Sequence, residues 1–392
     1  MRNCKTLLLI TLAATTLVSC KAGYNQLYYD NTTNSTATPP CNPGPADGSA
    51  DERAKKVLRL IATFSCENKS QFNRVMAGQH LGTVGNYVTE DTFTSLMNSF
   101  TINSVTPAVL SVEYGATENF SFENRQKANL TLQTHWNKNG LVSISWMPKN
   151  PWPSDFTTNY SDNVNLEDLY KDPNNEYYKT WHTQLDEIAK ALDDLQQRNV
   201  AVLWRPLPAM NTESVWWGIK ASTGKGTEAQ FEELWKNMFN YLHTTKGLHN
   251  LIWVFAPMDT TLATSNKPIN WGLYETQVDI VAPIARNNDL TLRDYQDMIN
   301  TGKPLAMSEL SPAYASSVVT STSSKNFDTA LYSKKLTESY PFIAYWVSWN
   351  DAKIDDKVHY LSLTSNLNAL TTLQNINTIT TEKITNNNLF SF

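Results

Sequence analysis

Short apolar segments alternate with amphipathic segments along most of the chain, and this alternation limits the possible folds more than any other feature. The apolar segments are rich in β-branched and aromatic residues, which is typical of strands. Eight of them are found, starting near residues 74, 106, 141, 200, 250, 278, 304 and 342. Their apolar runs are continuous rather than alternating, which indicates parallel strands that are buried on both faces.

Helical segments separate most of these predicted strands. In the segment 177–199 the apolar residues share one helical face and are Trp181, Leu185, Ile188, Leu192 and Leu195. Repeated strand–helix units over about 340 residues predict a (β/α)8 TIM barrel of the α/β class. A doubly wound sheet would alternate in the same way, but no GxGxxG motif follows the first strand, so the barrel is favoured.

Composition narrows the range of partners. The chain has 392 residues, a net charge of −5 and a pI near 5.7, so charge gives no reason to expect nucleic acid or an anionic membrane surface. Aromatic residues are frequent, with 12 Trp and 17 Tyr. Such rings serve either as core packing or as flat platforms for sugar rings, and composition does not separate the two roles.

The segment 1–20 predicts a secretory signal. Arg2 and Lys5 precede the apolar run TLLLITLAATTLV, which is too short to span a bilayer, and LVSC then ends at Cys20. This pattern is typical of a bacterial lipoprotein acylated at Cys20, and an ordinary signal peptide is the alternative. We expect a lipid-anchored protein, with the outer membrane or cell surface as its location. No acidic sorting run follows Cys20, so the sequence does not indicate which membrane leaflet would hold the lipid anchor.

The segment 21–50 is polar, shows no strand or helix period and predicts a flexible tether ahead of a barrel domain at 51–392. Apart from Cys4 and Cys20 in the leader, the cysteines are Cys41 and Cys66. In an oxidising compartment these two could form a disulfide that joins the arm to the first helix. With no CxxC and no histidines at ligand spacing, we expect no metal site and no cofactor.

Polar and aromatic residues at the ends of the predicted strands mark a candidate site, because TIM barrels carry their active sites there. We expect a sugar-binding groove made of His80, Glu113, Trp146, Arg205, Asn211, Trp216, Trp217, Glu309 and Trp349. Trp346 is a weaker candidate. For each tryptophan the alternative is core packing, and for each charged residue it is neutralisation of the barrel mouth or solvent exposure.

Glu309 lies at the end of the seventh strand, PLAMSEL, and is predicted to point into the barrel mouth. A retaining glycosidase needs two carboxyl groups about 5–5.5 Å apart, one as nucleophile and one as acid/base. In barrels such a pair often lies on strands four and seven. Glu309 occupies the nucleophile position, whereas Pro208 and Ala209 stand where strand four would carry the acid.

These motifs resemble those of glycoside hydrolase family 26, the β-mannanase family of retaining TIM-barrel enzymes. Its strand-four stretch reads about R-P-[FL]-H-E-M-N-G, then aromatic-W-W-G, and here 205–211 reads RPLPAMN and 216–218 reads WWG. Its strand-seven pattern K-P-x-x-x-[ST]-E resembles KPLAMSE at 303–309. The segments AGQH, HNLIWVFAP and AYWVSWND of this chain also resemble the first, fifth and eighth strands of the family. The resemblance therefore covers about residues 55–365.

The chain departs from this pattern at catalytic positions. By the resemblance, Ala209 replaces the acid/base Glu, Pro208 replaces the His before it, and Met147 replaces a His after the third strand. The family's sixth strand runs V-D-[IV]-[IV]-G-x-D-x-Y, whose Tyr holds the nucleophile, but here 278–286 reads VDIVAPIAR. Coordinated losses of this kind are typical of a natural release of catalytic constraint.

Three functions remain open at this point. The first is a cell-surface lipoprotein that binds β-mannan or a related β-glycan with little or no hydrolysis and works with outer-membrane glycan-uptake proteins. The second is an active endo-β-1,4-mannanase that uses Glu309 as nucleophile and a relocated acid, either Glu213 or Glu113. The third is a barrel with a protein-docking role. General acid assistance contributes about 10²–10⁴-fold to a rate, so its loss at Ala209 favours binding over cleavage.

Overall fold

The computed structural model describes residues 38–66, 74–83, 98–100, 104–115, 121–152, 165–219, 226–259, 277–313, 327–354 and 357–389. Residues 37–392 form one compact unit. The predicted signal, Cys20 and the first part of the predicted tether lie outside the described residues. Within the described ranges, no helix has the length and apolar character needed to cross a membrane.

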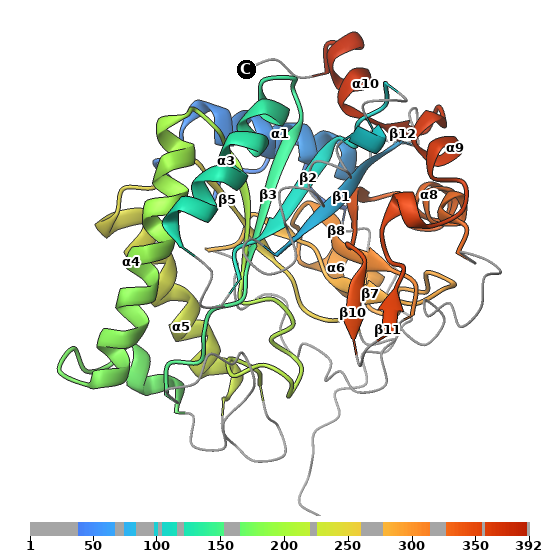
Figure 1. Ribbon diagram of the computed structural model, residues 1–392. Helices are drawn as coiled ribbons and strands as arrows, with labels where there is room; N and C mark the ends of the chain where they lie inside the picture. The colour runs from blue at the N-terminus through green and yellow to red at the C-terminus, as the bar shows by residue number, and fades with distance from the viewer. Residues whose placement is uncertain are drawn as a thin grey trace, which may run out of the picture. The chain divides into compact units, whose positions relative to one another are not determined.

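Eight parallel strands close into a barrel (Figure 1). They are β1 (Val75–Thr83), β2 (Val109–Glu113), β3 (Leu141–Trp146), β4 (Val202–Pro206), β5 (Leu251–Phe255), β6 (Ile280–Val281), β8 (Leu305–Ser311) and β9 (Ile343–Ser348). Neighbouring strands pair in parallel, and β9 pairs with both β8 and β1, which closes the ring. The predicted TIM barrel and its strands are confirmed.

Additional strands extend the barrel at its ends. β7 (Ile284–Arg286) continues the direction of β6 along β8, after Pro283, which has no N–H for the strand ladder. β12 (Thr378–Ile379) pairs with β1, and β10 (Ala352–Ile354) pairs antiparallel with β11 (Lys357–His359). β7 matters for function because it brings Arg286 beside the seventh barrel strand.

Helices connect these strands. They are α1 (Glu52–Ser65), α3 (Phe122–Trp136), α4 (Glu176–Gln197), α5 (Glu228–Asn240), α6 (Tyr295–Asn300), α8 (Thr329–Glu338), α9 (Ala369–Gln374) and α10 (Thr381–Asn386). The short turns are η2 (Leu166–Leu169), η3 (Tyr241–Thr245), which is a π-helix, and η4 (Leu363–Ser365). The predicted apolar face of α4 is buried. Thr227 and Gln230 form a capping box that starts α5.

The helix α1 covers the N-terminal end of the barrel. Ser65 Oγ donates a hydrogen bond to Phe342 O and accepts one from Leu305 N, at the starts of β9 and β8. The backbone N–H of Asp51 donates to His249 O, two residues before β5. In Figure 1, α1 and the β10–β11 hairpin lie at opposite ends of the unit. The candidate site therefore lies at the end opposite to α1.

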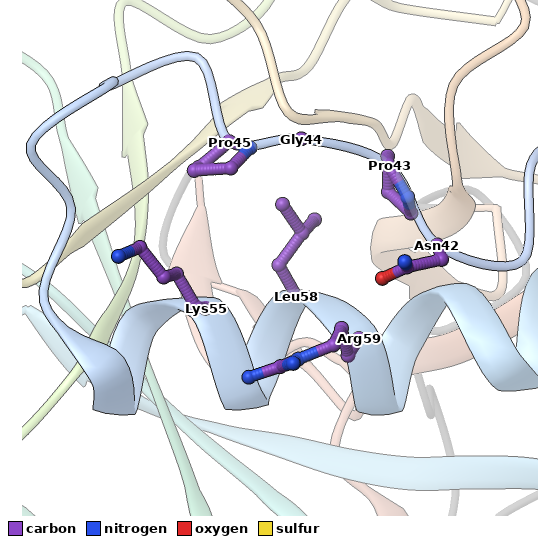
Figure 2. Close-up of a pocket in the computed structure, with 7 residues that line it drawn as sticks. All are labelled: Asn42, Pro43, Gly44, Pro45, Lys55, Leu58 and Arg59. Atoms are coloured by element: carbon purple, nitrogen blue, oxygen red, sulfur yellow. The ribbon is translucent and has the colours of Figure 1, made fainter.

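The arm before α1 is held against this helix. Cys41 and Cys66 are joined by a disulfide, with a Cα–Cα distance of 5.0 Å. Figure 2 shows residues 42–45 arching over α1, with Leu58 pointing from the helix toward the arm. A hollow of about 370 Å³ lies between arm and helix. The disulfide between Cys41 and Cys66, which the sequence allowed but did not require, is therefore present in the structure.

Candidate active site

Charged side chains from different strands meet at the C-terminal end of the barrel. Glu113 from β2, Arg205 from β4 and Glu309 from β8 are each at most 3% exposed. Glu309 Oε1 accepts a hydrogen bond from Arg286 Nε at 2.7 Å. Arg205 Nη1 donates to Ser308 Oγ at 3.3 Å. The predicted strand-end residues Glu113, Arg205 and Glu309 thus form one cluster.

The register of β7 explains why Arg286 reaches Glu309. Ile284 lies opposite Glu309 in the parallel pair, and Arg286 follows two residues later. Because strand side chains alternate between faces, Ile284, Arg286 and Glu309 share one face. In the sequence, position 286 differs from the family pattern only as the last residue of the sixth strand. Its role as the partner of Glu309 depends on this register, which one-dimensional motif comparison does not contain.

Glu113 is a buried carboxyl group with only part of its bonding capacity used. Its Oε1 accepts a hydrogen bond from Met147 N at 2.8 Å, while Oε2 is buried without a hydrogen-bond partner among the described residues. Burial raises the pKa of Glu113, against the opposing effects of Ser145 and Arg205, and the Glu309 charge raises this pKa further. Glu113 therefore holds a proton more readily than an exposed carboxyl group does.

Arg205 is the cation at the centre of the cluster. Burial lowers the pKa of Arg205, while the Glu309 and Glu113 charges raise it, and a guanidinium stays protonated at neutral pH. Its guanidinium carbon lies 5.3 Å from the centroid of the Trp349 ring, a cation–π geometry. Arg205 Nη2 is buried and has no hydrogen-bond partner among the described residues.

His80 and Trp349 extend this cluster. Their rings stack with centroids 3.7 Å apart, and Trp349 is partly exposed. Burial, followed by the charge of Arg205, lowers the pKa of His80 well below its usual range, so the ring is neutral. His80 Nδ1 lies 3.0 Å from Gly82 N and 3.0 Å from Asn350 Oδ1, which together fix the orientation of the ring. His80 Nε2 is buried and has no hydrogen-bond partner among the described residues.

Three of the predicted sugar platforms are wrong. Trp146, Trp216 and Trp217 are at most 3% exposed, and the weaker candidate Trp346 is fully buried. The indole N–H groups of Trp216 and Trp217 donate to Pro148 O and Pro208 O, and Trp146 stacks with both Trp181 and Trp204. The segment after β4 folds back onto the barrel, which places its aromatic rings in the core. Trp349 alone among the predicted tryptophans is partly exposed.

The expected sugar-binding role of Asn211 is also corrected. Its amide donates to Met258 O at 2.8 Å and accepts from Met258 N at 2.7 Å, in a side chain that is 1% exposed. Both ends of the amide are thus used by one backbone segment. Asn211 ties the segment after β4 to the segment after β5, which positions the rim of the barrel.

The backbone at Ala209 is unusual. Leu207 and Ala209 have φ values of 50° and 59°, in the left-handed region that costs non-glycine residues about 1–2 kcal/mol. Ala209 N donates to Ala256 O, and Thr212 Oγ1 donates to Ala209 O. This conformation is held by neighbouring residues although position 209 carries only a methyl group, which has no proton to donate.

The two candidates for a relocated acid differ in their surroundings. Glu213 is exposed on the segment after β4, whereas Glu113 is buried in the charged cluster with Arg205 and Glu309. A carboxyl group that remains protonated near neutral pH needs an environment that raises its pKa. Glu113 therefore fits an acid role better than Glu213 does.

Comparison with known proteins agrees with this geometry. Residues 46–370 match the family described as Glycosyl hydrolase family 26. The chain belongs to this family. A mannan endo-1,4-beta-mannosidase of Bacillus subtilis (strain 168) is 29% identical to the family 26 barrel over 322 residues, covering 78% of this chain and 82% of that protein.

Solved structures are similar to this family 26 barrel in fold. The B. subtilis mannanase man26 has a TM-score of 0.73 at 24% identity, with 88% of this chain and 96% of that chain covered. A β-mannanase from a symbiotic protist of the termite Reticulitermes speratus has a TM-score of 0.62 at 20% identity, with 87% and 97% covered. The family that the motifs at 205–218 and 303–309 resemble is thus confirmed.

Proposed function

We propose that this family 26 barrel binds β-mannan or a related β-linked glycan and hydrolyses it slowly or not at all. One observation carries the proposal: the carboxylate at the nucleophile position, Glu309, is bound by the Arg286 guanidinium at 2.7 Å. A charge-assisted hydrogen bond of this kind stabilises the free carboxylate and makes it a weaker nucleophile. Ala209 adds to this effect because it supplies no proton to the leaving sugar.

The same cluster supports glycan binding. His80 Nε2, Glu113 Oε2 and Arg205 Nη2 are buried polar atoms without a hydrogen-bond partner among the described residues. Leaving such a group unsatisfied costs about 1–3 kcal/mol, which a sugar hydroxyl or a water molecule would recover. The partly exposed ring of Trp349 supplies an apolar face beside them. We choose β-mannan as the glycan because the similar proteins are mannan endo-1,4-beta-mannosidases.

Calorimetric titration with mannohexaose and other β-linked oligosaccharides tests the binding proposal. We expect the full chain to bind at least one of them, and Trp349→Ala to weaken that binding at least tenfold by removing the stacking face. Phe122→Ala, at an exposed aromatic residue of α3, is the matched control and should bind as the parent does. Absence of binding to every glycan, together with an intact fold, would contradict the proposal.

An active mannanase is a second candidate, favoured by the environment of Glu113. Its raised pKa and its interaction with Glu309 would suit a relocated general acid. Release of reducing ends from mannan at high protein concentration tests this function. If Glu113 is the relocated acid, the release of reducing ends should disappear in Glu309→Gln and in Glu113→Gln. It should persist in Glu213→Gln. Undetectable release by the parent chain removes this candidate.

We also propose acylation at Cys20 and anchoring of the protein to a bacterial membrane, with the outer membrane as the proposed location. The support is the leader pattern that ends in LVSC. Cys20→Ala should move the protein from the membrane fraction to the aqueous fraction, as measured by detergent phase partition after expression in a bacterial host. Partition of both forms into the aqueous phase would contradict the anchor.

A further inference from the structure

A second cluster of polar side chains lies at the α1 end of the barrel and is not used by the proposed function. Asp47 from the arm is 2% exposed, and its two carboxylate oxygens each meet a different histidine. Oδ1 lies 2.8 Å from His243 Nε2, and Oδ2 lies 2.8 Å from His249 Nδ1. One ligand atom from each of these residues lies within 4.8 Å of those of the other two.

The surroundings of these side chains suit metal ligands. His243 Nδ1 lies 3.0 Å from Thr244 Oγ1, and a bond from the second ring nitrogen is what orients a ligating histidine. The His243 ring also packs on Phe239, with centroids 5.5 Å apart. Ser49 N donates to Asp47 Oδ1 at 2.7 Å, which orients the carboxylate. His243 and Asp47 are thus each supported by a contact outside the cluster.

The elements that carry these residues are held in place. His243 belongs to the π-helix η3, a rare conformation that is frequently found at functional sites. The backbone of His249 is bound on both sides, since its N–H donates to Gln196 Oε1 and its carbonyl accepts from Asp51 N. Asp47 lies between the disulfide at Cys41 and the start of α1. A ligand at this cluster would join the arm to the barrel.

We propose that Asp47, His243 and His249 bind a borderline divalent transition metal, with Zn²⁺ as the best fit. Two imidazole nitrogens and a carboxylate suit Zn²⁺, Cu²⁺ or Ni²⁺ better than Mg²⁺ or Ca²⁺, which prefer oxygen ligands. The side chains of His243 and His249 are 25% and 34% exposed, so the ion can enter and retain water ligands. The site acts as a clasp on the arm, at the end of the barrel opposite to Glu309.

Sequence spacing did not indicate this site. The ligands are 196 and 6 residues apart, from 47 to 243 and from 243 to 249, and neither interval matches a usual metal motif. The barrel brings the arm, η3 and the start of β5 together, and this proximity exists only in the folded chain.

Calorimetric titration of the full, untagged and unreduced chain with Zn²⁺ tests the proposal, because a polyhistidine tag would itself bind the metal. We expect the parent to bind Zn²⁺ at one strong site and its Tm to rise with Zn²⁺. In His249→Gln and in Asp47→Asn, binding should be at least tenfold weaker and the rise in Tm should be lost. His182→Gln, at a histidine of α4 outside the cluster, is the control and should bind as the parent does. Binding that is unchanged in His249→Gln overturns the proposal.

A spectroscopic measurement keeps the proposal testable if these variants fold poorly. With one equivalent of Cu²⁺ bound to the parent chain, electron paramagnetic resonance should show coupling to imidazole nitrogens. In a chain that keeps its leader, coordination by Cys4 or Cys20 would give a sulfur-ligated spectrum instead, and such a spectrum without nitrogen coupling overturns the proposal. Failure to bind Zn²⁺, Cu²⁺, Ni²⁺ or Co²⁺ at submillimolar concentration overturns it as well.

Discussion

Single residues decide the chemistry at the mouth of this barrel. Arg286 places a guanidinium on Glu309, and Ala209 presents a methyl group from a backbone held in the left-handed region. Under the proposed function the two residues act on different steps, since Arg286 weakens the nucleophile and Ala209 supplies no proton. Because the scaffold around both positions is in place, the loss of activity that we propose should be reversible by substitution.

The variant Ala209→Glu/Arg286→Tyr is expected to gain mannanase activity. The new carboxyl group can protonate the leaving sugar, and removal of the guanidinium frees Glu309 to attack, so the rate should rise by about 10²-fold or more. Reducing-end release from mannan measures the gain. Ala209→Gln/Arg286→Tyr is the matched control, with the same backbone strain and no proton to donate. Equal rates in the two double variants would exclude an acid role for position 209.

At the scale of elements, α3 and the strand after it enclose a histidine that must stay neutral. His135 is 2% exposed, and its Nε2 lies 3.2 Å from Ala108 O. A Cβ placed on Gly140 would lie 2.1 Å from this nitrogen, so the turn between α3 and β3 requires glycine at that position. Burial lowers the pKa of His135 to about 4.

This pKa predicts a loss of stability in mild acid. The unfolded chain takes up the His135 proton near pH 6.5, whereas the folded chain does so near pH 4. The unfolded state therefore binds more protons in this window, and the free energy of unfolding should fall as pH drops from about 6.5 to about 4, by roughly 3 kcal/mol. Below that window the contribution is constant.

Urea unfolding at pH 7 and pH 4.5 checks this prediction, with His135→Gln as the comparison. The difference between the two pH values should be smaller in His135→Gln than in the parent. Asp279 acts in the opposite sense, because burial raises its pKa to about 6 and stability is lost as pH rises through that value. Both chains contain Asp279, so its effect cancels in the comparison. An identical pH difference in the two chains would contradict the assignment to His135.

At the scale of the whole molecule, the two ends of the barrel hold different groups of interacting residues. The C-terminal end gathers Glu113, Arg205 and Glu309, while the opposite end holds α1 and the arm with the Cys41–Cys66 disulfide. Contacts that hold the arm are thus separated from the charged cluster by the barrel itself. Stability and glycan binding should therefore respond independently to changes at the arm.

The variant Cys41→Ser/Cys66→Ser tests this independence. Removing a cross-link between residues 25 apart should lower the free energy of unfolding by about 3 kcal/mol, because the unfolded chain regains conformational freedom. Chemical denaturation measures this loss, and glycan affinity should stay within twofold of the parent. A large loss of affinity without unfolding would show that the arm end and the barrel mouth are coupled.

Local patterns in the amino-acid sequence were sufficient to predict the barrel, the order of its strands and the family. Continuous apolar runs and strand-end motifs are local properties, and strands buried on both faces leave few other arrangements. These patterns also predicted that Glu113, Arg205 and Glu309 would meet, because parallel strands bring their C-terminal ends to one edge.

The remaining features depend on contacts that form only when the chain is folded. Burial of Trp216 and Trp217 depends on how the segment after β4 folds back, and the partner of Glu309 depends on the register of β7. The Asp47–His243–His249 cluster depends on where the arm crosses the barrel. Each of these features depends on contacts between residues that are distant in the sequence. Such contacts stabilise the protein only once folding has brought the residues together, so local sequence patterns do not reveal them.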